Sequence, residues 1–184
     1  MSAKLAQLCA YLDRLQGRDN LSKLETLLHD AVYSFENFEE LAAFSDEHYV
    51  RNKVRFNTWY DMWVICWKPG QYNPIHDHTD SSCAFKILKG TATEIIYQKT
   101  GRHDDLGEYV RQIEKRSFAT YELCLAQDDT IHRIVNESQT EDLVTLHIYS
   151  PPLAMKFYEE EGETRYKPVK MPKELENPTP RPSA

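Results

Sequence analysis

Apolar side chains recur with a helical period through the first part of the chain. The spacing i, i+3, i+4, i+7 is occupied by Leu5, Leu8, Cys9, Leu12 and Leu15, and Gly17 follows them. Residues 21–32 repeat this spacing, and residues 37–44 have the composition of a third, shorter helical piece. Such periodicity is typical of amphipathic helices whose apolar stripe faces a core.

After Ser45 the pattern becomes that of strands. Short segments rich in β-branched and aromatic residues alternate with turn residues such as Lys68-Pro69-Gly70 and Thr100-Gly101. The predicted strands are residues 49–57, 61–67, 84–90, 91–99, 109–115, 117–123, 130–137 and 143–150. Eight short strands at this spacing predict an all-β sandwich or barrel.

A chain of 184 residues is long enough to bury one sizeable core. We expect an N-terminal helical region, residues 1–45, packed on a β domain, residues 46–170. A final hairpin around Glu161-Gly162 would complete this domain. Residues 171–184 are rich in proline and polar side chains, so we expect them to be disordered.

Charge and composition exclude several classes of partner. Acidic residues outnumber basic ones 29 to 22, and a net charge of −7 provides no basic footprint for nucleic acid. No apolar run approaches the length that spans a bilayer, and the N-terminus lacks the apolar core of a signal peptide. The four cysteines lack CxxC spacing and are interpreted as buried thiols. We therefore expect a soluble, cytoplasmic protein, and a monomer.

Three histidines are candidates for a metal site. If residues 74–78 are extended, His76 and His78 share one face of the strand, although such a pair alone is weak evidence. His132 lies in another predicted strand, which a barrel could bring opposite the pair. Three neutral imidazoles suit Fe, Zn, Cu or Ni and leave coordination positions open. His29, His48 and His103 have no comparable pattern.

Several separate motifs resemble one known family. The run Gly70-x5-His76-x-His78-x4-Cys83-x6-Gly90 resembles the first cupin motif with cysteine in place of its usual glutamate, and His132-x3-Asn136 resembles the end of the second. Together with YVRN (49–52), IHRIVN (131–136) and LHIYSPP (146–152), these motifs resemble thiol dioxygenases of the cysteine dioxygenase type. The resemblance implies a cupin fold, a small β-barrel or jelly roll, with N-terminal α-helices.

The same resemblance implies a mononuclear non-heme Fe(II) site held by His76, His78 and His132. With no carboxylate ligand, the substrate thiolate would supply the negative charge. It further implies a thioether crosslink between Cys83 and Tyr149. Thr145, His147 and Tyr149 alternate along one strand, so they share a face and would form a hydroxyl, imidazole and phenol relay.

Arg51, assisted by Tyr49, would bind the substrate carboxylate, because a guanidinium presents a planar fork suited to that group. The implied reaction is oxidation of L-cysteine by O2 to cysteine sulfinic acid, with both oxygen atoms incorporated. One alternative is 3-mercaptopropionate dioxygenase, whose members tend to have glutamine at the Arg51 position. Less favoured alternatives are a non-oxidative metal cupin and a metal-free binding module. Met155 stands where vertebrate relatives have a cysteine, and it is a candidate for limiting the pocket size.

Overall fold

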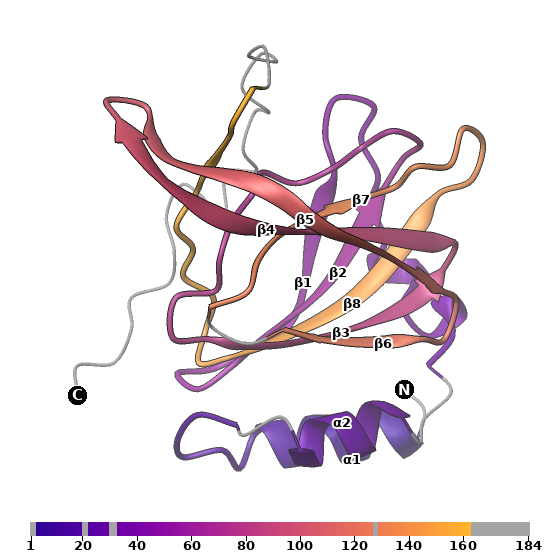
Figure 1. The fold of residues 1–184 in the computed structure, drawn as a ribbon. Coiled ribbons are helices and arrows are strands. Elements are labelled where there is room, and N and C mark those ends of the chain that lie inside the picture. Colours follow the sequence, from indigo (N-terminus) through magenta and orange to yellow (C-terminus); the bar gives the residue numbers. More distant parts are fainter. Residues whose placement is uncertain (1–2, 20–21, 30–32, 127–128, 163–184) are drawn as a thin grey trace.

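The structure is a computed structural model that describes residues 3–19, 22–29, 33–126 and 129–162. Two facing sheets form its body (Figure 1). The strands are β1 Val50–Phe56, β2 Asp61–Trp67, β3 Ser82–Lys89, β4 Thr91–Asp104, β5 Gly107–Ala119, β6 Leu123–Ala126, β7 Ile131–Val135, β8 Leu143–Ser150 and β9 Glu159–Glu160. One sheet has the order β1-β2-β8-β3-β6 and the other β7-β4-β5-β9. The prediction of an all-β core is confirmed.

The helices α1 (Ala3–Leu12) and α2 (Ser22–His29) lie on the outer side of the five-stranded sheet, away from β4 and β5 (Figure 1). None of the helices in the described ranges is long and apolar enough to cross a bilayer. The predicted third helix is instead two 3-10 turns, Phe35–Asn37 and Glu39–Leu41. Phe38 lies between them with a non-helical φ of −130°, and its side chain, 1% exposed, is part of the core.

The central strands of the five-stranded sheet are buried on both faces. On β2, Met62, Val64 and Cys66 join the helices in one apolar cluster, whereas Trp63, Ile65 and Trp67 belong to a second cluster between the sheets. Strand β8 alternates in the same way, with Val144, Leu146 and Ile148 toward the helices. The inner face of β8 is therefore directed into the barrel, as the alternation of the sequence predicted.

The second sheet differs from the prediction in one respect. Residues 109–115 and 117–123 were expected to be two strands, but β5 runs without a break to Ala119 and pairs with β4 from Thr91↔Ala119 to Asp104↔Gly107. The chain then turns at Tyr121, which has φ 76°, before β6 begins. The prediction was wrong here because the exposed side chains of β5 are polar and give no apolar strand pattern. The pairing is formed by backbone hydrogen bonds, which do not depend on such a pattern.

Gly90 forms the turn between β3 and β4 and has φ +82°. A Cβ at this position would lie 2.6 Å from the carbonyl oxygen of Asp142. The turn therefore requires glycine for both its conformation and its space.

The end of the β domain is only partly described. Strand β9 pairs in parallel with β5, and the N–H of Glu161, the residue after β9, donates to the Val110 carbonyl oxygen at 2.8 Å. The second arm of the predicted hairpin and the tail at 171–184 lie outside the described residues. The domain boundaries at 45 and 170 remain predictions.

Candidate metal centre and substrate pocket

Three imidazoles converge between the two sheets. His76 and His78 lie in the segment that leads into β3, and His132 lies in β7. An isolated antiparallel bridge joins His76 and His132, whose backbones exchange hydrogen bonds of 3.0 and 2.9 Å. One candidate ligand atom from each of the three residues lies within 4.8 Å of the others. The barrel thus brings together the histidines that the sequence singled out.

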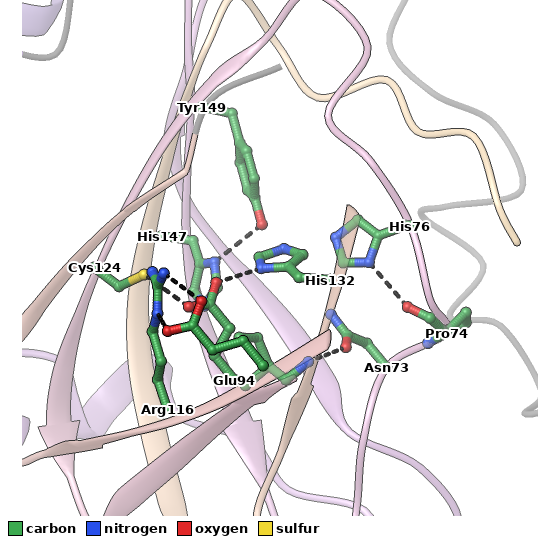
Figure 2. A network of polar contacts seen from close by, with 11 residues as sticks. Asn73, Pro74, His76, Glu94, Arg116, Cys124, His132, His147 and Tyr149 are labelled. Atoms are coloured by element: carbon green, nitrogen blue, oxygen red, sulfur yellow. Dashed lines mark hydrogen bonds and ion pairs between the residues drawn. The ribbon is translucent and has the colours of Figure 1, made fainter. Parts of the chain in front are cut away.

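The Nδ1 atoms of two of these rings are already engaged. His76 Nδ1 lies 2.9 Å from the Pro74 carbonyl oxygen, and His132 Nδ1 lies 2.7 Å from Glu94 Oε1 (Figure 2). Both contacts leave Nε2 for a ligand position. Burial, reinforced by the neighbouring His132, lowers the pKa of His76 to about 3, so its ring is neutral.

This donor set fits a divalent transition metal. A neutral imidazole whose other nitrogen is hydrogen-bonded is the usual form of histidine as a ligand. Three such ligands leave further positions for other molecules. Within the described residues the cluster contains no carboxylate or thiolate, and Cys83 stands at the position where the cupin motif has its glutamate.

A hydrogen-bonded chain runs along the inner face of β8. Tyr149 Oη lies 3.0 Å from His147 Nδ1, and His147 Nε2 lies 2.9 Å from Thr145 Oγ1. Trp67 Nε1 donates to Thr145 Oγ1 at 3.0 Å, and Thr145 donates to the Ile65 carbonyl oxygen at 3.4 Å.

The donors and acceptors in this series of hydrogen bonds determine which side-chain atoms carry protons. Because Thr145 has only one hydroxyl proton, its oxygen accepts from both Trp67 and His147. His147 is therefore protonated at Nε2 and accepts at Nδ1 from the Tyr149 hydroxyl. Burial, with the positive charge of Arg51, lowers the pKa of His147, and burial raises the pKa of Tyr149. Both rings are thus neutral.

Cys83 lies on β3 directly across from Tyr149 on β8. The thiol is 1% exposed, and burial raises its pKa. The two residues that the sequence paired as partners of a crosslink are therefore direct neighbours in the sheet.

Arg51 and Tyr49 enter the same pocket from β1 and the residue before it. The pocket is lined by Tyr49, Arg51, Ile65, Asn73, Pro74, His76, Tyr149, Leu153, Met155 and Phe157. The Arg51 guanidinium lies over the Trp63 ring at 4.4 Å, and its buried Nε has no hydrogen-bond partner among the described residues. Tyr49 stacks on Trp67 with ring centroids 4.6 Å apart. All nine predicted site residues therefore surround one region, and Met155 lines it.

Two buried carboxylates of this region were missed by the sequence interpretation. Glu94, 1% exposed, contacts His132, and Asp61, 4% exposed, accepts from the Leu153 N–H at 3.3 Å. Burial raises the pKa of Asp61, which lies opposite Tyr149 in the pairing of β2 with β8. The sequence signal for Asp61 is that it is an acidic residue within an otherwise apolar strand. The sequence signal for Glu94 is its spacing of two from buried Ala92, which places the carboxylate on the same inward face of the strand.

Comparison with known structures shows the fold. A Klebsiella pneumoniae protein with a double-stranded β-helix domain superposes with a TM-score of 0.53 at 16% identity, covering 66% of this chain and 88% of that one. This agreement confirms the predicted cupin architecture.

Comparison with known sequences shows the family. The model of cysteine dioxygenase type I matches residues 2–160. Cysteine dioxygenase type 1 of Rattus norvegicus is 31% identical over 153 residues, which are 80% of this chain and 74% of the rat protein. The Danio rerio protein of the same name is 32% identical over 136 residues, which are 72% of this chain and 66% of the fish protein. The resemblance seen in the motifs is thereby confirmed: the chain belongs to the cysteine dioxygenase type I family, whose members are iron dioxygenases.

Proposed function

We propose that this protein is a cysteine dioxygenase that uses Fe(II) to oxidise L-cysteine with O2 to cysteine sulfinic acid. In this reaction the thiol R–SH and one O2 give R–SO2H, so both oxygen atoms enter the product and no further reductant is consumed. The observation that carries the proposal is the shared pocket of His76, a candidate metal ligand, and Arg51, a buried cation with an unsatisfied donor. That pairing suits a small molecule with a thiol at one end and a carboxylate at the other.

His76, His78 and His132 would hold the iron, which supplies a Lewis-acidic and redox-active centre for the thiolate and dioxygen. The three rings are 3%, 0% and 2% exposed, so the pocket excludes bulk water from that centre. The Pro74 carbonyl oxygen and Glu94 keep two of the rings oriented.

Arg51 would bind and orient the substrate carboxylate. The side chain is 7% exposed, and a buried guanidinium is stabilised when an anion enters its pocket. Trp63 supports the guanidinium from one side, while the stacked Tyr49 and Trp67 restrict the space beside it. Leu153 and Met155 add apolar walls that exclude water and favour a small substrate.

Tyr149 would present a neutral phenol at the pocket. Its hydroxyl proton is held toward His147 Nδ1, and the chain through Thr145 and Trp67 prevents the imidazole from rotating. The phenol oxygen keeps lone pairs that can accept a hydrogen bond from the substrate. A phenol fixed in this way orients the bound substrate through its amine, without taking up or releasing a proton itself.

The alternative activity, oxidation of 3-mercaptopropionate, differs only in lacking the substrate amine. Arg51 favours cysteine because the relatives that resemble that activity tend to carry glutamine at this position. A non-oxidative cupin would be expected to retain the motif glutamate that Cys83 replaces. The cytoplasmic location and the monomeric state remain predictions.

The test compares three thiols on protein loaded anaerobically with Fe(II): L-cysteine, 3-mercaptopropionate and cysteamine, which lacks the carboxylate. We expect the highest kcat/KM for sulfinate formation with cysteine and the lowest with cysteamine. A preference for 3-mercaptopropionate would be consistent with the iron site but would reject L-cysteine as the substrate. Equal rates with cysteamine would reject the role of Arg51.

A further inference from the structure

Glu94 is a buried carboxylate for which the proposed reaction has no direct use. It lies on β4, and its Oε1 is 2.7 Å from His132 Nδ1, with both side chains 2% exposed. Its other oxygen, Oε2, accepts a weak hydrogen bond from the Cys124 thiol at 3.6 Å. A carboxylate buried to this degree is costly unless a positive charge or hydrogen bonds compensate it.

The basic side chain of Arg116 does not provide that compensation. Arg116 of β5 is within electrostatic reach of Glu94, but its side chain is 48% exposed, and its Nε and Nη2 donate to Glu114 at 2.7 and 2.8 Å. The guanidinium is therefore engaged elsewhere and screened by water. A cation held by His76, His78 and His132 would supply a positive charge on the opposite side, beyond the His132 ring.

His132 connects Glu94 to the candidate metal site. Figure 2 shows the His132 ring between Glu94 and His76, and the His76 and His132 ring centroids are 4.8 Å apart. With Glu94 accepting at Nδ1, His132 carries its proton on that nitrogen and keeps the Nε2 lone pair for an ion. A divalent cation there would be one imidazole away from the buried negative charge.

We propose that Glu94 is a positioning residue that places the negative charge missing from the ligand set directly behind His132. The carboxylate fixes the tautomer and orientation of that ligand and increases its basicity. Cys124, donating to the other oxygen, holds the carboxylate in place. The inference depends on the proposed function only through the three-histidine site, and it holds whichever thiol is the substrate.

Two effects on the metal follow from this arrangement. A more basic His132 binds Fe(II) more tightly. The buried negative charge also stabilises Fe(III) more than Fe(II), since the ferric ion carries the larger charge. Glu94 therefore lowers the reduction potential of the bound iron, which favours release of electrons by the ferrous site.

The test is Glu94→Gln, which keeps the shape and an acceptor for His132 Nδ1–H but removes the charge. The matched control is Glu137→Gln, which removes a carboxylate that is 46% exposed and bound to Lys115. Fe(II) affinity is measured anaerobically against a competing chelator, and the potential of the bound iron by redox titration. For Glu94→Gln we expect affinity about 10- to 100-fold weaker. We also expect the reduction potential of the bound iron to rise, by about 59 mV for each tenfold loss of Fe(III) affinity relative to Fe(II) affinity.

Wild-type affinity and potential in a folded Glu94→Gln variant would overturn the inference. If the variant does not fold, nitrogen-15 NMR of the wild-type protein loaded with Zn(II), a diamagnetic substitute, decides the question. A proton on His132 Nδ1 protected from exchange supports the role of Glu94, and a proton on Nε2 overturns it. Failure of the wild-type protein to bind iron would instead reject the metal site itself, and with it the proposed function.

Discussion

Cys83 and Tyr149 face each other directly across the antiparallel pair β3 and β8. Side chains at such positions have Cβ atoms about 4.5–5.5 Å apart, which allows a thiol to reach the neighbouring ring. We therefore predict a Cys83–Tyr149 thioether in protein that has turned over. Its formation removes the thiol hydrogen and one ring hydrogen, with dioxygen as the oxidant.

Peptide mass spectrometry would detect this crosslink as a linked pair of peptides lighter by two hydrogen atoms. Cys83→Ala should abolish it and keep measurable activity, because the bond fixes the phenol without creating the chemistry. Cys66→Ala, which removes a thiol buried on the helix side of the sheet, should leave the crosslink intact. Separate, unmodified peptides after many turnovers of active protein would contradict the prediction.

Arg51→Ala is expected to raise KM for cysteine by about 30-fold or more, since leaving a buried carboxylate unpaired costs roughly 2–5 kcal/mol. Steady-state oxygen consumption measures this change. Arg55→Ala on the same strand is the control, because Arg55 is 47% exposed and binds Asp13 outside the pocket. An unchanged KM for Arg51→Ala would remove Arg51 from substrate binding.

Because the pKa of His147 is lowered by burial, we expect the stability of the folded protein to depend on pH. Its pKa in the folded protein is well below 6.5, so at lower pH the unfolded chain binds a proton that the native state does not. The contribution of His147 is therefore most favourable above about pH 6.5 and declines as the pH falls, by at most about 1.4 kcal/mol per pH unit. Urea unfolding of metal-free protein should show a steeper acid decline for wild type than for His147→Gln. Parallel curves would show that His147 titrates normally.

Gly90→Ala is expected to destabilise the fold by more than Gly101→Ala. Both positions have positive φ, +82° and +81°, but only at Gly90 does a Cβ meet a backbone atom, the Asp142 carbonyl oxygen at 2.6 Å. Strain of this backbone conformation costs about 1 kcal/mol or more at either site, and the clash adds to it at Gly90. Thermal unfolding of the two variants measures the difference. Equal losses would show that the turn relaxes without cost.

Much of the site could be predicted from the sequence because its chemistry lies in short local motifs. The period of two predicts from local spacing alone that His76 shares a face with His78, and Thr145 with His147 and Tyr149. The family resemblance then supplied Arg51 and Cys83, which no periodicity could identify. The helical stripes of α1 and α2 likewise predicted their packing on a sheet.

The missed features depend on contacts between distant segments. Glu94 acquires its role only when β4 pairs with β7 and brings it to His132, and nothing local distinguishes it from a surface glutamate except its alternation with Ala92. The continuous β5 was missed because its polar residues carry no apolar pattern. Trp67 likewise combines two roles that only the tertiary structure reveals, since this buried core residue stacks on Tyr49 and donates to Thr145.

Turnover of L-cysteine by the Fe(II)-loaded protein under isotopically labelled dioxygen decides whether this protein is a cysteine dioxygenase. Oxygen uptake and the mass of the product are recorded together. We expect one O2 to be consumed per cysteine sulfinic acid formed, with the label in both product oxygens. No uptake, or a product labelled at one oxygen or none, would contradict this expectation.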